Sequence, residues 1–226
     1  MKVASTSLEI YLSQFCAEKD TLTPLFEEEE KFKKKLNLLT AQNYKLKKKS
    51  FGIKNFLNLN FNNEVTLESH SSLKKVFKTK IGKLIKNYFF FAFIRNPFDW
   101  IVSFFWWYLF YFKKMKINDI NKLKQKKLDN IFNKFLEEEC DKFFILNKNI
   151  ITNKHVNIKV FKYEEFNKNL KYIKKKLKLS NERILIKKIK FKKLKIKKNI
   201  LLNKSQKDKI FKSGYYFFEK YYKNYK

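Results

Sequence analysis

The sequence predicts an α/β fold in which a mostly parallel central sheet is flanked by helices. Residues 88–94 form a continuous apolar run, which is typical of a strand covered on both faces in a parallel sheet. Residues 157–163 indicate a second strand. Helical patterns follow both runs, and strands that alternate with helices are typical of α/β proteins. A chain of 226 residues has room for one domain, so we expect a single domain over residues 1–226.

The first expected element is a helix over residues 8–15, because apolar side chains recur there on one face. Thr6 and Glu9 have the spacing of a capping box. We therefore expect this helix to begin within residues 5–7.

Three segments separate this helix from the first strand. Residues 27–49 are acidic and then basic, and are expected to form a solvated helix and loop. Residues 55–64 are rich in asparagine and are expected to be irregular. Residues 71–85 predict an amphipathic helix.

The first strand is followed by Asn96 and Pro97. Asparagine is a preferred N-cap and proline is favoured at the first helical position. A helix is therefore predicted from this turn to about residue 112, and the negative charge of Asp99 suits its first turn.

The remaining elements follow in order. Residues 116–144 are expected to form a helix on the surface, and residues 167–177 a helix after the second strand. Residues 184–198 alternate lysine with apolar residues and receive no assignment. Ser205 is expected to cap a final helix that runs toward residue 222.

The charge is extreme, with 53 Lys+Arg against 21 Asp+Glu and a net charge of +32. This favours a nucleic-acid partner as one interpretation. However, Arg95 and Arg183 are the only arginines, and lysine lacks the planar fork that reads bases and clamps phosphates. The excess of Lys, Asn, Ile, Phe and Tyr is typical of an A+T-rich genome, so we interpret most of the charge as background.

Cellular location is indicated by weaker signals. Cys16 and Cys140 are too few for a disulfide framework or a metal site, and they fit a reduced cytoplasmic setting. Lys2 is followed by a polar run, so no signal peptide is expected. The uninterrupted apolar stretch of residues 100–112 is shorter than the roughly 20 residues of a membrane span. A peripheral membrane contact through aromatic residues is the alternative interpretation.

Two groups of residues are candidates for binding anions. Small hydroxyl residues open the first helix after Lys2, and free backbone N–H groups at a helix start can surround a phosphate. Arg95 leaves the end of a strand, where open α/β sheets bind ligands, and Ser103 lies two turns beyond Asn96. The alternatives are an ordinary helix cap, an arginine satisfied within the protein and a surface hydroxyl.

Four segments follow one another along the chain: KVASTSLEIYLSQFC, AQNY, His-Ser-Ser and FAFIRNPFDWIVSFFWW. Their order and spacing resemble the carbohydrate-type sulfotransferases. These enzymes use 3′-phosphoadenosine-5′-phosphosulfate (PAPS), and they include the heparan sulfate 2-O-sulfotransferase type and small bacterial and viral relatives. The resemblance is strongest over residues 1–112, and residues 160–166 are similar to a family strand that ends in Tyr-Glu-x-hydrophobic. It implies a P-loop-like sulfotransferase domain.

The resemblance also implies a set of donor-binding residues: Lys2, Ser5, Thr6, Ser7, Arg95 and Ser103. Lys2 would contact the bridging oxygen of the leaving group, and residues 5–7 would hold the 5′-phosphosulfate. Arg95 and Ser103 would bind the 3′-phosphate of PAPS. The acceptor would be a hydroxyl group, expected on a glycan, with no specific nucleic acid involved.

The catalytic residues implied are Lys2 and His70. His70 falls where relatives of the 2-O type carry a catalytic histidine, and imidazole suits a general base near neutral pH. The alternative is a surface histidine in a loop. Glu9 and Glu64 are further candidates for the base. No metal is expected, because lysine and backbone dipoles can neutralise the developing charge.

The chain departs from the family pattern at two places. Relatives have an apolar strand before the lysine, whereas this chain begins at Met1 and Lys2, so we expect an N-terminally truncated copy whose first strand is missing. Trp100 stands where relatives often have arginine. The alternative function is a lysine-rich nucleic-acid-binding protein without catalytic activity.

Overall fold

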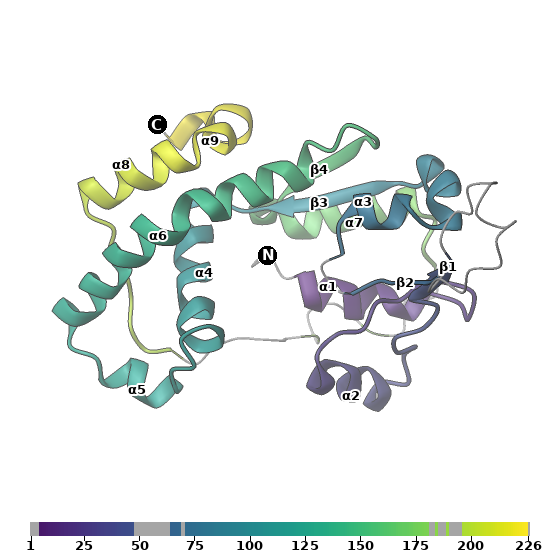
Figure 1. Ribbon diagram of the computed structural model, residues 1–226, viewed down its shortest axis with the longest axis horizontal. Helices are drawn as coiled ribbons and strands as arrows, with labels where there is room; N and C mark the ends of the chain where they lie inside the picture. The colour runs from purple at the N-terminus through teal and green to yellow at the C-terminus, as the bar shows by residue number, and fades with distance from the viewer. Residues whose placement is uncertain are drawn as a thin grey trace, which may run out of the picture. The chain divides into compact units, whose positions relative to one another are not determined.

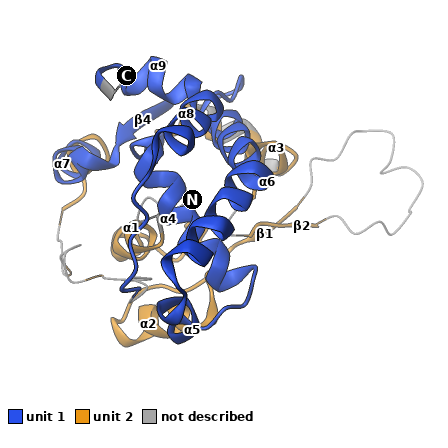
Figure 2. Cartoon of the chain, turned by 90° about the vertical axis from the view of Figure 1, so that its left-hand side faces the viewer, with its two compact units in different colours: residues 1–5, 90–173, 192–226 blue, residues 6–89, 174–191 orange. Residues whose placement is uncertain are grey.

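The computed structural model describes residues 5–47, 64–68, 71–180, 184, 189 and 196–225. The chain divides into two compact units (Figure 2). Unit 1 comprises residues 1–5, 90–173 and 192–226, and unit 2 comprises residues 6–89 and 174–191. The single domain expected from the sequence stays a prediction.

Unit 1 contains the predicted parallel pair of strands. β3 (Phe90–Ile94) and β4 (Ile158–Lys162) lie side by side (Figure 1), with Phe90 opposite Ile158 and Ile94 opposite Lys162. A helix follows each strand, as expected for an α/β fold, which confirms the predicted fold class. A separate antiparallel pair belongs to unit 2.

The helix after β3 begins where the sequence predicts. α4 (Pro97–Tyr111) is capped by Asn96, whose side-chain Oδ1 accepts a 3.0 Å hydrogen bond from the N–H of Phe98. The proline at the first helical position lacks an N–H that would otherwise need a partner. This local chemistry explains why the start of α4 is predictable.

The long helix α6 (Gln125–Ile151) corrects the expectation of a surface helix. It follows the short α5 (Ile117–Lys122) and buries a row of apolar side chains in the core of unit 1. These include Leu128, Phe132, Phe135, Leu136, Cys140 and Phe144. The lysines of α6 face outward and obscure this apolar stripe in the sequence.

Trp100 lies at the centre of this core and is fully buried. Its ring packs edge to face on Phe143 at 5.2 Å and on Phe217 at 5.5 Å between centroids. Its Nε1–H has no hydrogen-bond partner within the described residues. Trp100 therefore contributes packing to unit 1 rather than polar contacts.

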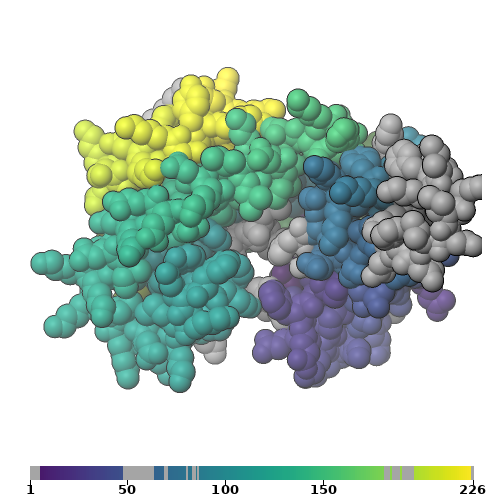
Figure 3. Space-filling model, viewed as in Figure 1, coloured from purple at the N-terminus to yellow at the C-terminus, as the bar shows by residue number. Residues whose placement is uncertain are grey.

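The C-terminal part of unit 1 also differs in detail from the prediction. α8 (Lys204–Ser213) lies against α6 (Figure 3) and is capped by Asn203 rather than by Ser205. Gly214 separates α8 from α9 (Tyr215–Tyr221), and η6 (Lys223–Tyr225) follows. A Cβ atom at Gly214 would lie 3.0 Å from the Ile210 carbonyl oxygen and 3.2 Å from the Phe144 ring, so glycine permits this close packing.

The segment after β4 matches the prediction. A single helical turn, η4 (Tyr163–Glu165), leads into α7 (Phe166–Lys176). The tight turn brings Tyr163 and Glu164 directly to the carboxyl end of the parallel pair.

Unit 2 begins at Thr6, within α1 (Ser5–Leu12), and η1 (Ser13–Phe15) follows. The helix therefore starts within the predicted run, but the capping box of Thr6 and Glu9 is wrong. Thr6 is already helical, and the Glu9 carboxylate accepts a 3.4 Å hydrogen bond from the hydroxyl of Thr23.

The acidic and basic segment of unit 2 is not simply solvated. It forms α2 (Glu27–Lys35) and β1 (Lys45–Lys47), and β1 pairs antiparallel with the later strand β2 (Glu64–Thr66). Glu29 and Lys33 are buried, because α2 turns this face toward the interior of the unit. Residues 55–63 of the expected irregular segment, and most of residues 184–198, lie outside the described residues.

The helix expected over residues 71–85 is broken into α3 (Leu73–Phe77) and η3 (Lys80–Asn87). The break follows Lys78, and the Thr79 hydroxyl donates a 2.7 Å hydrogen bond to the Val76 carbonyl. A Cβ atom at Gly82 would lie 2.7 Å from the Phe77 carbonyl oxygen, so a glycine is needed where the chain returns to α3.

A helix with the length and hydropathy needed to cross a membrane is absent from the part of the chain that the structure describes.

Candidate functional site

The turn after β3 places Arg95 at the carboxyl end of the parallel strands. Ligands of open α/β sheets gather at this edge. The Arg95 side chain is 30% exposed, and its guanidinium carbon lies 5.6 Å from the centre of the Tyr163 ring. This is a cation–π contact, which stabilises the guanidinium without using its N–H groups as hydrogen-bond donors.

Asp99 is the acidic neighbour of Arg95. The two side chains approach to 3.9 Å between Nη2 and Oδ2, and the Asp99 side chain is 62% exposed. This separation is too long for a hydrogen bond, and exposed ion pairs contribute little. Arg95 therefore keeps the capacity to bind an external anion.

Glu164, which follows β4, contacts the turn that carries Arg95. Glu164 accepts a 2.7 Å hydrogen bond from the backbone N–H of Asn96 through Oε1. Its other oxygen, Oε2, accepts a 2.7 Å hydrogen bond from the hydroxyl of Tyr222. Tyr222 is 2% exposed, so this contact is shielded from water.

Glu164 lies in the segment of residues 160–166 that resembles a family strand, but no role was predicted for it, and none was predicted for Tyr222. The sequence did indicate that Glu164 lies near Arg95, because two parallel strands bring the residues that follow them to the same edge of the sheet. Tyr222 follows a helix and is separated from Glu164 by 58 residues, so no local pattern links them.

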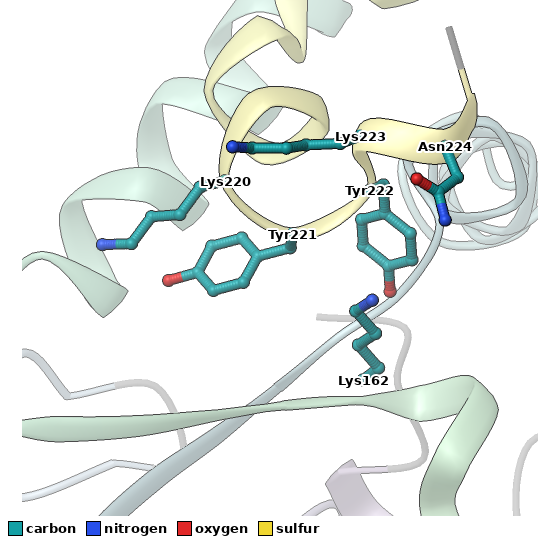
Figure 4. Close-up of a pocket in the computed structure, with 6 residues that line it drawn as sticks. All are labelled: Lys162, Lys220, Tyr221, Tyr222, Lys223 and Asn224. Atoms are coloured by element: carbon teal, nitrogen blue, oxygen red, sulfur yellow. The ribbon is translucent and has the colours of Figure 1, made fainter.

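A pocket of about 250 Å³ opens beside this network. Its lining consists of Lys162, Lys220, Tyr221, Tyr222, Lys223 and Asn224. Figure 4 shows Lys162, from the end of β4, pointing toward Tyr222, and the Lys162 Nζ lies 5.1 Å from the centre of that ring. Three of the six lining residues are lysines and none is acidic, so the pocket favours anions.

Ser103 lies within α4 and is half-buried. It is seven residues beyond the cap Asn96, which is close to two helical turns, so the two positions share a face of the helix. Its predicted contact with a phosphate stays a prediction.

The other predicted anion site lies at the start of α1. Ser5, Thr6 and Ser7 form the first turn of this helix, where backbone N–H groups have no partner within the helix. Lys2 and His70 lie outside the described residues. Because Thr6 and Ser7 belong to unit 2 while Arg95 and Ser103 belong to unit 1, each half of the predicted site is described by itself.

Glu9, a further candidate for the general base, faces the interior of unit 2. Burial raises the pKa of its carboxyl from 4.5 to about 7, and the positive charge of Lys33 opposes this shift. Lys33 is fully buried, and its ammonium lies 3.6 Å from Glu30 Oε1. Glu9 thus belongs to a charged cluster whose members Glu29 and Lys33 are buried. Glu64, in β2, is exposed.

Within the described residues, no group of three or more His, Cys, Asp or Glu side chains is arranged to hold a metal ion.

Comparison with known proteins defines the family. The model of the sulfotransferase family matches residues 1–219, which is nearly the whole chain. The chain therefore belongs to the sulfotransferase family, whose members are transferases of sulfuryl groups. Searches of curated proteins and of solved structures found no significant match.

Proposed function

We propose that the protein transfers a sulfuryl group from PAPS to a hydroxyl group of a carbohydrate. Family membership over residues 1–219 supports sulfuryl transfer. The observation that carries the choice of donor is Arg95, which is partly exposed at the carboxyl end of β3 and is backed by an aromatic ring. The carbohydrate acceptor rests on the motifs shared with carbohydrate-type sulfotransferases.

PAPS carries anionic groups at both ends, and the two candidate sites suit one end each. Arg95 and Ser103 would hold the 3′-phosphate, since a guanidinium can donate two hydrogen bonds to one phosphate. The first turn of α1, with Ser5, Thr6 and Ser7, would hold the 5′-phosphosulfate through backbone N–H groups. PAPS supplies the activated sulfuryl group.

The remaining roles belong to Lys2 and His70. Lys2 would neutralise the charge that develops on the leaving phosphate. His70 would accept the proton of the acceptor hydroxyl as the new bond forms. The placement of Glu9 favours His70 over Glu9 as the base, because the Glu9 carboxyl is hydrogen-bonded to Thr23 inside unit 2.

Substitution of Arg95 tests the donor site. Arg95→Ala should weaken the binding of adenosine 3′,5′-bisphosphate by about 10- to 100-fold, because hydrogen bonds to a charged group are lost. Arg95→Lys should recover only part of the affinity, since lysine keeps the charge but not the fork. Isothermal titration calorimetry measures both effects.

Lys154→Ala is the matched control for charge. Lys154 is exposed in the loop before β4, so its removal changes the net charge of unit 1 without touching the turn. Its affinity should equal that of the wild type. A folded Arg95→Ala variant with unchanged affinity would refute the assignment of Arg95.

A further inference from the structure

We propose that Glu164 and Tyr222 are positioning residues that hold the turn of Arg95 and Asn96 in the geometry that binds the 3′-phosphate. The proposal rests on the function proposed above. It extends the site from the turn itself to the C-terminal end of unit 1, which neither family membership nor the sequence motifs assign to donor binding.

The first step is the geometry of the Glu164 carboxylate. Its two oxygens each accept one 2.7 Å hydrogen bond, from the Asn96 backbone N–H and from the Tyr222 hydroxyl. Charge-assisted hydrogen bonds of this length are among the stronger contacts in proteins. One side chain thereby joins three segments that are far apart in the sequence: the turn after β3, the turn after β4 and the end of α9.

The second step is what these contacts do to Arg95. The Asn96 N–H belongs to the peptide group that joins Arg95 to Asn96, and a peptide group is planar. Glu164 holds that group from one side, while the Asn96 side chain caps α4 through the N–H of Phe98. The backbone that carries the guanidinium is thus held at Asn96 by both contacts, and the preceding Ile94 pairs with Lys162 in the parallel ladder. Because binding does not then have to order the turn, affinity is gained by preorganisation.

The third step concerns Tyr222. Its hydroxyl fixes the second oxygen of Glu164, and its ring is buried at 2% exposure beside the Lys162 ammonium. Without that hydroxyl, the carboxylate can rotate away from Asn96. The neighbouring Tyr221 lines the same pocket but hydrogen-bonds to Tyr216. It is therefore not part of the hydrogen-bond network of Glu164.

A pair of nucleotides tests the proposal on the full chain. Adenosine 3′,5′-bisphosphate carries the 3′-phosphate, whereas adenosine 5′-monophosphate does not. We expect Tyr222→Phe to weaken binding of the bisphosphate about tenfold, since binding must then order the turn that Glu164 no longer holds in place. Binding of the monophosphate should not change. The preference for the 3′-phosphate, measured as the ratio of the two affinities by competition calorimetry, should therefore fall about tenfold.

Glu164→Gln is the second variant, and it should lower the same ratio at least as much. The matched controls are Tyr221→Phe and Glu165→Gln, which alter the adjacent tyrosine and the adjacent carboxylate, and both should keep the wild-type ratio. Glu165 lies 3.6 Å from Lys168 on the surface. Melting temperatures without ligand identify any variant that fails to fold, and Tyr222→Phe carries the test if Glu164→Gln is one of these.

The outcomes separate the two levels of the account. Equal loss of affinity for both nucleotides, or an unchanged ratio in both variants, would overturn the positioning role while leaving Arg95 as the 3′-phosphate site. A wild-type protein without preference for the 3′-phosphate would instead refute the donor site itself. The positioning role of Glu164 and Tyr222 would then fall as well.

Discussion

The buried carboxyl of Glu9 shows how the interior of unit 2 acts on a single residue. Burial is the largest cause of its raised pKa of about 7, and the nearby Glu29 and Glu30 raise it further. Lys33 and the hydroxyl of Thr23 act in the opposite direction. The folded protein therefore binds the Glu9 proton more tightly than the unfolded chain does.

This shift predicts a dependence of stability on pH. Between pH 4.5 and about 7 the folded state keeps the proton that the unfolded state loses, so the free energy of unfolding should fall as the pH rises. Glu9→Gln removes the titrating group. The free energy of unfolding of the variant, relative to that of the wild type, should increase by up to ~3 kcal/mol from pH 4 to pH 8.

Urea unfolding followed by circular dichroism measures this difference. Glu18→Gln, at an exposed position of the same unit, is the control for the loss of one carboxylate. Parallel stability curves for the wild type and Glu9→Gln would contradict the raised pKa.

At this scale, the sequence identified Arg95 because a rare arginine directly follows a strong strand signal and precedes a cap. Its position at the carboxyl end of β3 agrees with the prediction, while its role stays a prediction. Glu164 and Tyr222 could not be found in the same way. Glu164 lies 68 residues from Asn96 in the sequence and Tyr222 lies 58 residues from Glu164, so both contacts depend on tertiary packing.

Among the elements, helix starts with strong local chemistry were the most predictable. Asn96 and Pro97 define the start of α4, and both parallel strands lie within the predicted ranges. Ser205 was wrong as a cap because Asn203 has a better partner: its side chain and that of Gln206 form a reciprocal capping box. α6 was misjudged since its buried stripe is diluted by lysines.

The caps of two helices in unit 1 provide a matched comparison. Asn96→Ala and Asn203→Ala each remove a side-chain acceptor from a backbone N–H, at 3.0 Å and 2.9 Å. Each should lower the free energy of unfolding by about 1 kcal/mol. Only Asn96→Ala should also weaken binding of adenosine 3′,5′-bisphosphate, because only this cap adjoins Arg95.

Urea unfolding and calorimetry on the same preparations measure both quantities. Equal losses of nucleotide affinity in the two variants would show that affinity follows stability alone. That result would contradict a specific role for the turn.

For the molecule as a whole, alternation of strands and helices was enough to predict the α/β class. The division into two compact units was not predicted, because the boundary near residue 90 carries no glycine, proline or serine-rich linker. The net charge of +32 attracts anions over distances that salt screens. It therefore favours a charged donor and nucleic acids alike, and charge alone cannot distinguish an enzyme from a nucleic-acid-binding protein.

An assay for transfer of a labelled sulfuryl group from PAPS to a mixture of polysaccharides distinguishes an enzyme from a nucleic-acid-binding protein. The wild type should place the label in carbohydrate. His70→Ala should bind adenosine 3′,5′-bisphosphate normally but transfer about 10²- to 10⁴-fold more slowly, as expected for loss of a general base. His155→Ala, which alters the other histidine, should retain activity. A wild-type protein that binds the nucleotide yet labels no carbohydrate would contradict the proposed reaction.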